Sequence, residues 1–115
     1  MRFVASTSAE VREQIIAGAL DGSLPAGTKL PTVRALADEL GLAVNTVAKA
    51  YRDLETAAVI ETRGRAGSFV ALSADSAERA LQEAAVAYAA RARSLGVDAA
   101  RARAYIDAAL RPPAE

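Results

Sequence analysis

Apolar residues recur every three or four positions along three stretches in the first half of the chain, which is the spacing of amphipathic helices. The first stretch follows a capping box, in which the Thr7 hydroxyl would cap the helix and the Glu10 carboxylate would reach back. Gly22 is suited to end this helix. Its inward-facing positions are expected to be Val11, Ile15, Ala19 and Leu20.

The second and third stretches are separated only by a short turn that contains Gly41. Thr32 is suited to cap the second helix, and the third helix is expected to begin near Val44. Two short helices joined in this way have the spacing of a helix-turn-helix. The apolar positions of the second helix are Val33, Leu36, Ala37 and Leu40. The inner stripe of the third is expected to be Val47, Ala50, Tyr51, Leu54 and Ala58.

The pattern becomes strand-like after the third helix. Residues 59–63 and 68–72 are rich in β-branched and aromatic side chains, and a glycine-bearing turn separates them. A β-hairpin that directly follows the second helix of a helix-turn-helix is a wing. Residues 1–74 are therefore expected to form a winged helix-turn-helix domain.

Residues 75–112 predict two further helices. The first has about twenty residues and ends before Gly96, and Asp98 is suited to cap the second. Alanine dominates both helices and buries little area, so the pair is expected to pack against a second chain. The alternative is a tail that folds back on its own winged helix. The expected dimerisation residues are Leu81, Tyr88, Leu95, Ile106 and Leu110.

The predicted fold is thus mainly α with a small β-hairpin, in which an N-terminal winged helix-turn-helix precedes a C-terminal two-helix dimerisation tail. The chain has no cysteine and no histidine, which removes the thiolate ligands, the commonest metal ligand and the commonest general base. No nucleophile–base pair, phosphate loop or metal-ligand spacing is present. We therefore expect no enzyme activity, no catalytic residue, no metal and no cofactor.

The sequence also lacks the features of a membrane or secreted protein. No apolar run approaches the roughly 18 residues needed to span a bilayer. The segment from Met1 to Ser6 has no signal-peptide apolar region. A cytoplasmic protein without a membrane partner is expected.

The net charge is zero, with 14 basic and 14 acidic residues, and residues 1–72 and 73–115 are each balanced as well. Many DNA-binding domains are basic overall, so this balance counts against DNA binding. If the protein binds DNA, its positive charge must be concentrated on one face.

Four segments resemble the GntR family of bacterial regulators. They are Arg12–Leu24, Leu30–Ala37, Thr46–Glu55 and Ile60–Val70, and the resemblance that they carry extends over roughly residues 10–71 without a gap. The run Asn45–Tyr51 resembles the short YtrA-like subgroup in particular. Members of that subgroup have a two-helix tail of about this length and are typically dimeric repressors. The resemblance therefore implies double-stranded DNA and a second copy of the chain as partners.

Three residues near the start of the third helix are candidate DNA contacts. Asn45 and Lys49 lie opposite the apolar stripe, where a recognition helix presents its first residues to base edges. Asn45 could make a bidentate contact with adenine; the alternative is an ordinary polar residue at a helix start. Lys49 could contact a phosphate or a guanine edge; the alternative is a solvated surface lysine. Thr46 resembles the family's backbone-contacting threonine, with a locally bonded hydroxyl as the alternative.

The second helix and the wing supply the other candidate contacts. Arg34 matches an arginine of the family's second-helix signature that contacts DNA in its relatives, and the alternative is an ion pair with Asp38. The arginines at the wing tip suit a neighbouring minor groove, or else they keep the strand edges soluble. The wing glycines are expected to adopt positive φ. The wing candidates are Arg63, Gly64, Arg65 and Gly67.

The sequence departs from the family at the start of the third helix. Many members have basic residues at the positions of Val44 and Ala48, and a capping side chain at Ala43. The operator sequence is therefore not given by the resemblance, and Val44 is suited to contact a thymine methyl. The leading hypothesis is a repressor that binds an inverted-repeat operator as a homodimer. The alternative is a ligand-responsive regulator, with a small-molecule effector of unknown identity held by the C-terminal helices.

Overall fold

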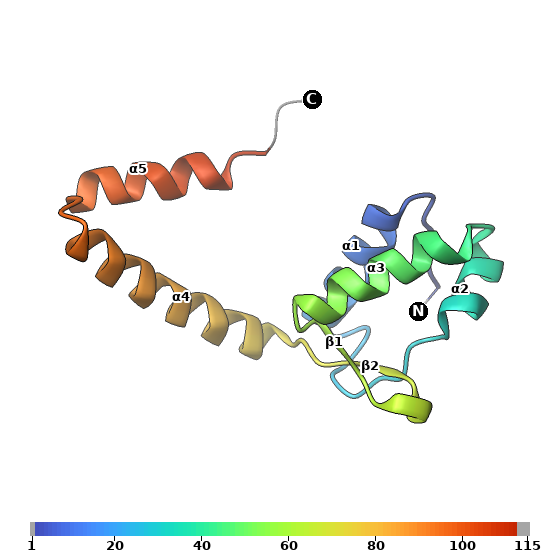
Figure 1. Ribbon diagram of the computed structural model, residues 1–115. Helices are drawn as coiled ribbons and strands as arrows, with labels where there is room; N and C mark the ends of the chain where they lie inside the picture. The colour runs from blue at the N-terminus through green and yellow to red at the C-terminus, as the bar shows by residue number, and fades with distance from the viewer. Residues whose placement is uncertain (1, 113–115) are drawn as a thin grey trace. The chain divides into compact units, whose positions relative to one another are not determined.

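The computed structural model describes residues 2–112, so Met1, the first residue of the predicted DNA-binding domain, lies outside them. Within these residues the chain has five α-helices and a two-stranded antiparallel sheet (Figure 1). This architecture confirms the predicted mainly α fold with a small hairpin. The elements are α1 (Ser8–Asp21), α2 (Val33–Leu40), α3 (Val44–Thr56), β1 (Ile60–Thr62), the 3-10 turn η1 (Gly64–Ala66), β2 (Ser68–Val70), α4 (Ala74–Ser94) and α5 (Ala99–Leu110).

The chain divides into two compact units between Ala77 and Glu78, about one turn into α4. The first unit contains α1, α2, α3 and the hairpin. The second contains most of α4 and all of α5. None of the helices in residues 2–112 combines the length and the apolar character needed to span a bilayer.

The start of α1 is capped from both sides, in a slightly different way from the predicted capping box. The Thr7 hydroxyl accepts a hydrogen bond of 3.1 Å from the Glu10 N–H, as expected. The Glu10 carboxylate instead reaches one residue further back, where it accepts from the Ser6 N–H (2.7 Å) and the Ser6 hydroxyl (3.0 Å). These bonds favour the ionised carboxylate and lower the pKa of Glu10.

α3 is the central element of the core, because it packs against both α1 and α2. Tyr51 lies on its buried face and donates a hydrogen bond of 2.7 Å to the Pro31 carbonyl, in the segment that leads into α2. Burial raises the pKa of Tyr51 to about 12, so its hydroxyl remains protonated and able to donate. The largest fully buried side chains of the core are Val11, Ile15, Leu36, Val47, Leu54, Ile60 and Val70.

Two predicted core positions were wrong. Leu20 is 43% exposed, because the buried face of α1 continues through Gly18 and Ala19 and leaves the next residue pointing outward. Ala58 is exposed and lies beyond the end of α3, which stops at Thr56. Both errors extended a correct helical stripe by one residue or one turn too far.

The hairpin is anchored at its base and exposed at its tip. β1 and β2 pair in the register Ile60↔Val70, Glu61↔Phe69 and Thr62↔Ser68, and the Ile60 and Val70 side chains are both buried. The segment before α2 also hydrogen-bonds to β2, since the Leu30 N–H donates to the Ser68 carbonyl (2.9 Å). The hairpin tip therefore projects from a base that belongs to the core.

The C-terminal unit is held by caps and by one interhelical hydrogen bond. Asp98 caps α5, as predicted, by accepting from the Arg101 N–H (2.9 Å). The Tyr88 hydroxyl on α4 donates to the Ala102 carbonyl on α5 (2.8 Å). Neither helix has a buried residue in the described part of the chain, so this unit lacks a core of its own.

The end of α3 places an alanine where glycine is the usual residue. Ala58 has φ 62°, in the left-handed region. The Val59 N–H donates to the Leu54 carbonyl (2.9 Å) and the Ala58 N–H donates to the Glu55 carbonyl (3.0 Å), which is the Schellman pattern. Val59 and Leu54 are both buried in the hydrophobic core, which favours this sharp stop despite the unfavourable φ.

We predict that Ala58→Gly raises the free energy of unfolding by about 0.5–1 kcal/mol, because glycine adopts left-handed φ without steric cost. Urea denaturation monitored by circular dichroism, at one protein concentration, would measure the change in midpoint. Ala57→Gly is the matched control, since Ala57 has φ −81° and gains nothing from glycine. Equal or lower stability of Ala58→Gly relative to the wild type would contradict the prediction.

Candidate nucleic-acid interface

The side of α3 that faces away from the core carries the polar candidates. Asn45, Lys49 and Arg52 are exposed, and Thr46 and Ala48, which flank them, are half-buried. Four buried residues on the opposite side fix this orientation: Val47, Ala50, Tyr51 and Leu54. The first turn of α3 has no side-chain cap, because Ala43 occupies the N-cap position. No capping side chain therefore covers the start of α3, and it is accessible to a partner.

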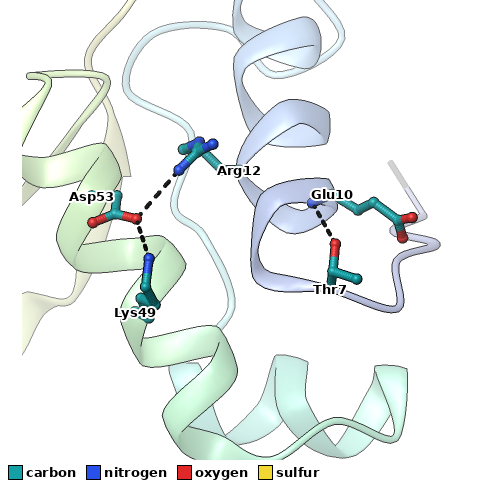
Figure 2. A network of polar contacts seen from close by, with 5 residues as sticks. All are labelled: Thr7, Glu10, Arg12, Lys49 and Asp53. Carbon is teal, nitrogen blue, oxygen red and sulfur yellow. Dashed lines mark hydrogen bonds and ion pairs between the residues drawn. The ribbon is translucent and has the colours of Figure 1, made fainter. Parts of the chain in front are cut away.

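Lys49 is not an isolated surface lysine, because it shares a carboxylate with a residue of α1 (Figure 2). Its Nζ lies 3.2 Å from Asp53 Oδ2, and the Arg12 Nη1 lies 3.3 Å from the same oxygen. The hydrogen bond from Lys49 is the main cause of a lowered pKa of Asp53, and the charges of Lys49 and Arg12 add to it. A DNA phosphate would therefore have to compete with Asp53 for Lys49.

Arg34 lies in the first turn of α2, behind a regular cap. The Thr32 hydroxyl accepts from the Ala35 N–H (3.1 Å), as predicted. Arg34 itself is exposed and forms no ion pair with Asp38 anywhere in residues 2–112, so the structure gives no support to the pairing considered as the alternative. Its charge is available to an external partner.

The first arginine of the wing is held against the hairpin. Arg63 Nε donates to Glu61 Oε1 (2.6 Å), and its Nη2 lies 2.5 Å from the same oxygen. Its guanidinium also stacks on the Phe69 ring, 4.3 Å from the ring centroid. Glu61 and Phe69 are cross-strand partners, so the three side chains form one cluster. Arg63 must leave Glu61 before it can enter a groove.

The wing tip presents the second arginine in a tight 3-10 turn. Arg65 is exposed and makes no ion pair within residues 2–112. Gly64 and Gly67 both adopt positive φ (54° and 110°), as predicted. A Cβ on Gly67 would lie 3.1 Å from the Lys29 Cε, so the glycine lets the lysine side chain lie across the wing. Lys29 therefore adds a cation beside Arg65's turn.

The carboxylates that pair with the cations were not anticipated from the sequence. Lys49 and Asp53 stand four positions apart on one helix, and Arg63, directly after β1, stands two positions after Glu61, so both spacings were available as signals. The Arg12–Asp53 pair joins residues 41 positions apart and has no local signal. No group of three acidic or other metal-ligating side chains gathers within residues 2–112.

The comparison with protein families agrees with this geometry. Residues 7–70, more than half of the chain, match the model described as "Bacterial regulatory proteins, gntR family". The chain belongs to the GntR family. The match begins at the cap of α1 and ends in β2, so it covers α1, α2, α3 and the wing.

Individual relatives narrow the assignment within the family. The HTH-type transcriptional regulator Rv1152 from Mycobacterium tuberculosis is 50% identical over 97 residues, which is 84% of this chain and 79% of that protein. The HTH-type transcriptional repressor YtrA from Bacillus subtilis is 42% identical over 73 residues, which is 59% of this chain and 55% of YtrA. The protein is thus a GntR-family transcriptional regulator of the YtrA-like subgroup, and the proteins it resembles are regulators, not enzymes.

A solved complex connects the fold with DNA. The DNA-binding domain of AraR, crystallised with operator ORE1, resembles this chain with a TM-score of 0.53 and 28% identity, over 58% of this chain and 82% of that one. Together with the family match, this likeness identifies the chain as a DNA-binding regulator.

We predict that Asp53→Asn strengthens binding to duplex DNA of random sequence by a few fold and steepens the slope of log K against log salt by about one, because Lys49 loses its carboxylate partner. Fluorescence anisotropy over a salt series would measure both quantities. Asp38→Asn is the matched control, since it changes the net charge equally but removes no ion pair in the described residues. Identical shifts for the two variants would show that net charge alone matters.

Proposed function

We propose that this regulator is a repressor that binds an inverted-repeat operator as a homodimer, with α3 in the major groove and the wing against the neighbouring minor groove. The observation that carries the proposal is the exposure of Asn45 and Lys49 on the face of α3 opposite the core. The first turns of a recognition helix are the part that meets base edges. The similarity to YtrA, a transcriptional repressor, supports the direction of regulation.

In this proposal the helix-turn-helix supplies both base and phosphate contacts. Asn45 contacts an adenine edge through its amide. Lys49 exchanges Asp53 for a phosphate or a guanine, while the half-buried Thr46 donates to the backbone near the helix start. Arg34, without an ion-pair partner in residues 2–112, contacts the DNA backbone from α2.

The wing contributes through its tip. Arg65 enters the minor groove first, because Arg63 is held by Glu61 and Phe69. Gly64 and Gly67, both at positive φ, let the turn approach the sugar-phosphate backbone closely. Arg63 either stays in its cluster and stiffens the wing or leaves it when a phosphate replaces Glu61.

The tail is proposed to supply the dimer. Within residues 2–112, α4 and α5 bury no residue, and an isolated pair of such helices is too small to be stable. Two-fold homodimers are the commonest assembly, and a second copy would cover the exposed apolar side chains. The most exposed of the proposed dimerisation residues are Leu81 (71%), Leu95 (61%) and Leu110 (76%); Tyr88 and Ile106 are more covered and line the groove between α4 and α5.

The DNA-binding roles can be tested by selecting bound sequences from random duplex DNA and then titrating the selected site. We predict an enriched inverted repeat. We also predict that Arg34→Ala weakens binding to it severalfold or more without a change in folding, because a charged contact is lost. Arg111→Ala removes another exposed arginine, which follows α5, and serves as the control. Absence of any enriched motif would overturn the proposed function, and unchanged affinity of Arg34→Ala would overturn that residue's role.

The dimer can be tested by size-exclusion chromatography with light scattering. We predict a mass of twice the chain's 11.9 kDa at micromolar concentration. Leu81→Glu should shift the protein to the monomer, because it places a charge in the apolar interface, while Leu20→Glu on α1 should leave the dimer intact. A wild-type protein with the mass of a monomer would contradict the proposed dimer.

A groove between α4 and α5 supports a second candidate function, the ligand-responsive regulator. It has a volume of about 520 Å³. Its walls are mainly apolar, with Tyr88, Val97 and Ile106 among them, and Arg93, Arg103 and Asp107 supply charge. A small-molecule effector and a partner chain would compete for this surface. A protein that remains monomeric in the light-scattering experiment would favour the ligand-responsive regulator.

A further inference from the structure

The first residue of α3 is an exposed valine. Val44 is 41% exposed, although the chain buries most of its other large apolar residues in the N-terminal unit. It precedes Asn45, the residue proposed to contact adenine, and lies one turn before Ala48 on the same side of the helix. This arrangement places a branched apolar side chain in the turn that would enter the major groove.

Stability of the fold does not account for this valine. The core beneath the turn is already filled by Leu36 and Val47, which are fully buried, and by the half-buried Leu42. β-Branched residues are also mediocre helix formers, so Val44 adds little to helix propensity. Its methyl groups are therefore left for a partner outside the chain.

The surroundings of Val44 disfavour recognition of guanine. The typical guanine contact is a bidentate arginine, and the first two turns of α3 contain none. The one cation there, Lys49, is a point charge without the bidentate fork of arginine, and Asp53 competes for it at 3.2 Å. What the turn does offer is an amide, on Asn45, beside two small apolar side chains, on Val44 and Ala48.

We propose that Val44 determines operator specificity by contacting the 5-methyl group of a thymine in the major groove. That methyl is the only apolar group that a base pair presents there, so it is the natural partner of an exposed valine. Each half-site then carries an A·T pair opposite the first turn of α3. The inference rests on the proposed function, since it requires α3 to occupy the major groove.

The experiment replaces thymines one at a time with deoxyuridine, which lacks the 5-methyl group but pairs identically. The duplex is the site selected by the wild-type protein, and affinity is measured by anisotropy at fixed salt. We expect one thymine in each half-site at which the replacement weakens binding about fourfold, the value of one buried methyl group. The same replacement should have no effect on Val44→Ala, so the two changes are not additive.

Val4→Ala is the matched control, because Val4 is 72% exposed and lies outside α3. This variant should keep the full sensitivity to deoxyuridine. A thermal melt of each variant shows whether folding is intact. Sensitivity that persists in Val44→Ala, or no sensitive thymine at all, would overturn the assignment while leaving DNA binding in place. A failure to enrich any site would overturn both the assignment and the proposed function.

A second variant tests the same contact by gain of specificity. Val44→Arg should change the preferred base at the sensitive position from thymine to guanine, since arginine pairs with the guanine O6 and N7. Selection from random duplexes with this variant measures the switch directly. A preference at that position that is unchanged by the arginine would show that Val44 does not face it.

Discussion

The packing of one face of α3 against α1 and α2 is the constraint on which the proposed interface depends. Its inward side chains are Val47, Ala50, Tyr51 and Leu54. Turning α3 about its axis would expose them, at about 1.5–3 kcal/mol for each large side chain. Because a helix has 3.6 residues per turn, their burial also fixes which residues point outward, Asn45 and Lys49 among them. The core thus determines the direction of the surface proposed to face DNA without contributing a residue to it.

The sequence predicted most of the fold, because most helices have residues at their ends that are typical of helix caps and stops. Thr7, Thr32 and Asp98 cap helices as expected, and Gly41 ends α2 in the left-handed conformation. The prediction failed at the end of α3, where no glycine marks the stop. There the chain turns so that Val59 joins Leu54 in the hydrophobic core, and this burial outweighs the cost of placing Ala58 at positive φ. A local pattern cannot indicate an end that is set by packing.

The candidate site was predictable in outline but not in its electrostatics. Periodicity alone places Asn45 on the outer face of α3, and turn chemistry alone places the two glycines of the wing at positive φ. Which cations are paired depends on neighbours in space. Arg12 reaches Asp53 across 41 positions, and Arg63 lies on Phe69 only because the hairpin register brings the two strands together. Helical or strand periodicity predicts which side chains are exposed. Whether an exposed cation is already paired with a carboxylate is known only from the folded structure.

The ion pairs of the basic residues bear on how a chain with no net charge can bind DNA selectively. Arg12, Lys49 and Arg63 each have a carboxylate partner, which reduces the positive potential of the surface proposed to face DNA. Affinity for random DNA grows with the number of phosphates neutralised, so one copy of this domain should be held weakly at arbitrary sequences. Discrimination must then come from contacts that depend on the base and from the proposed second copy. An exposed valine suits such a protein, because contact with a methyl group favours one base pair and adds nothing to binding elsewhere.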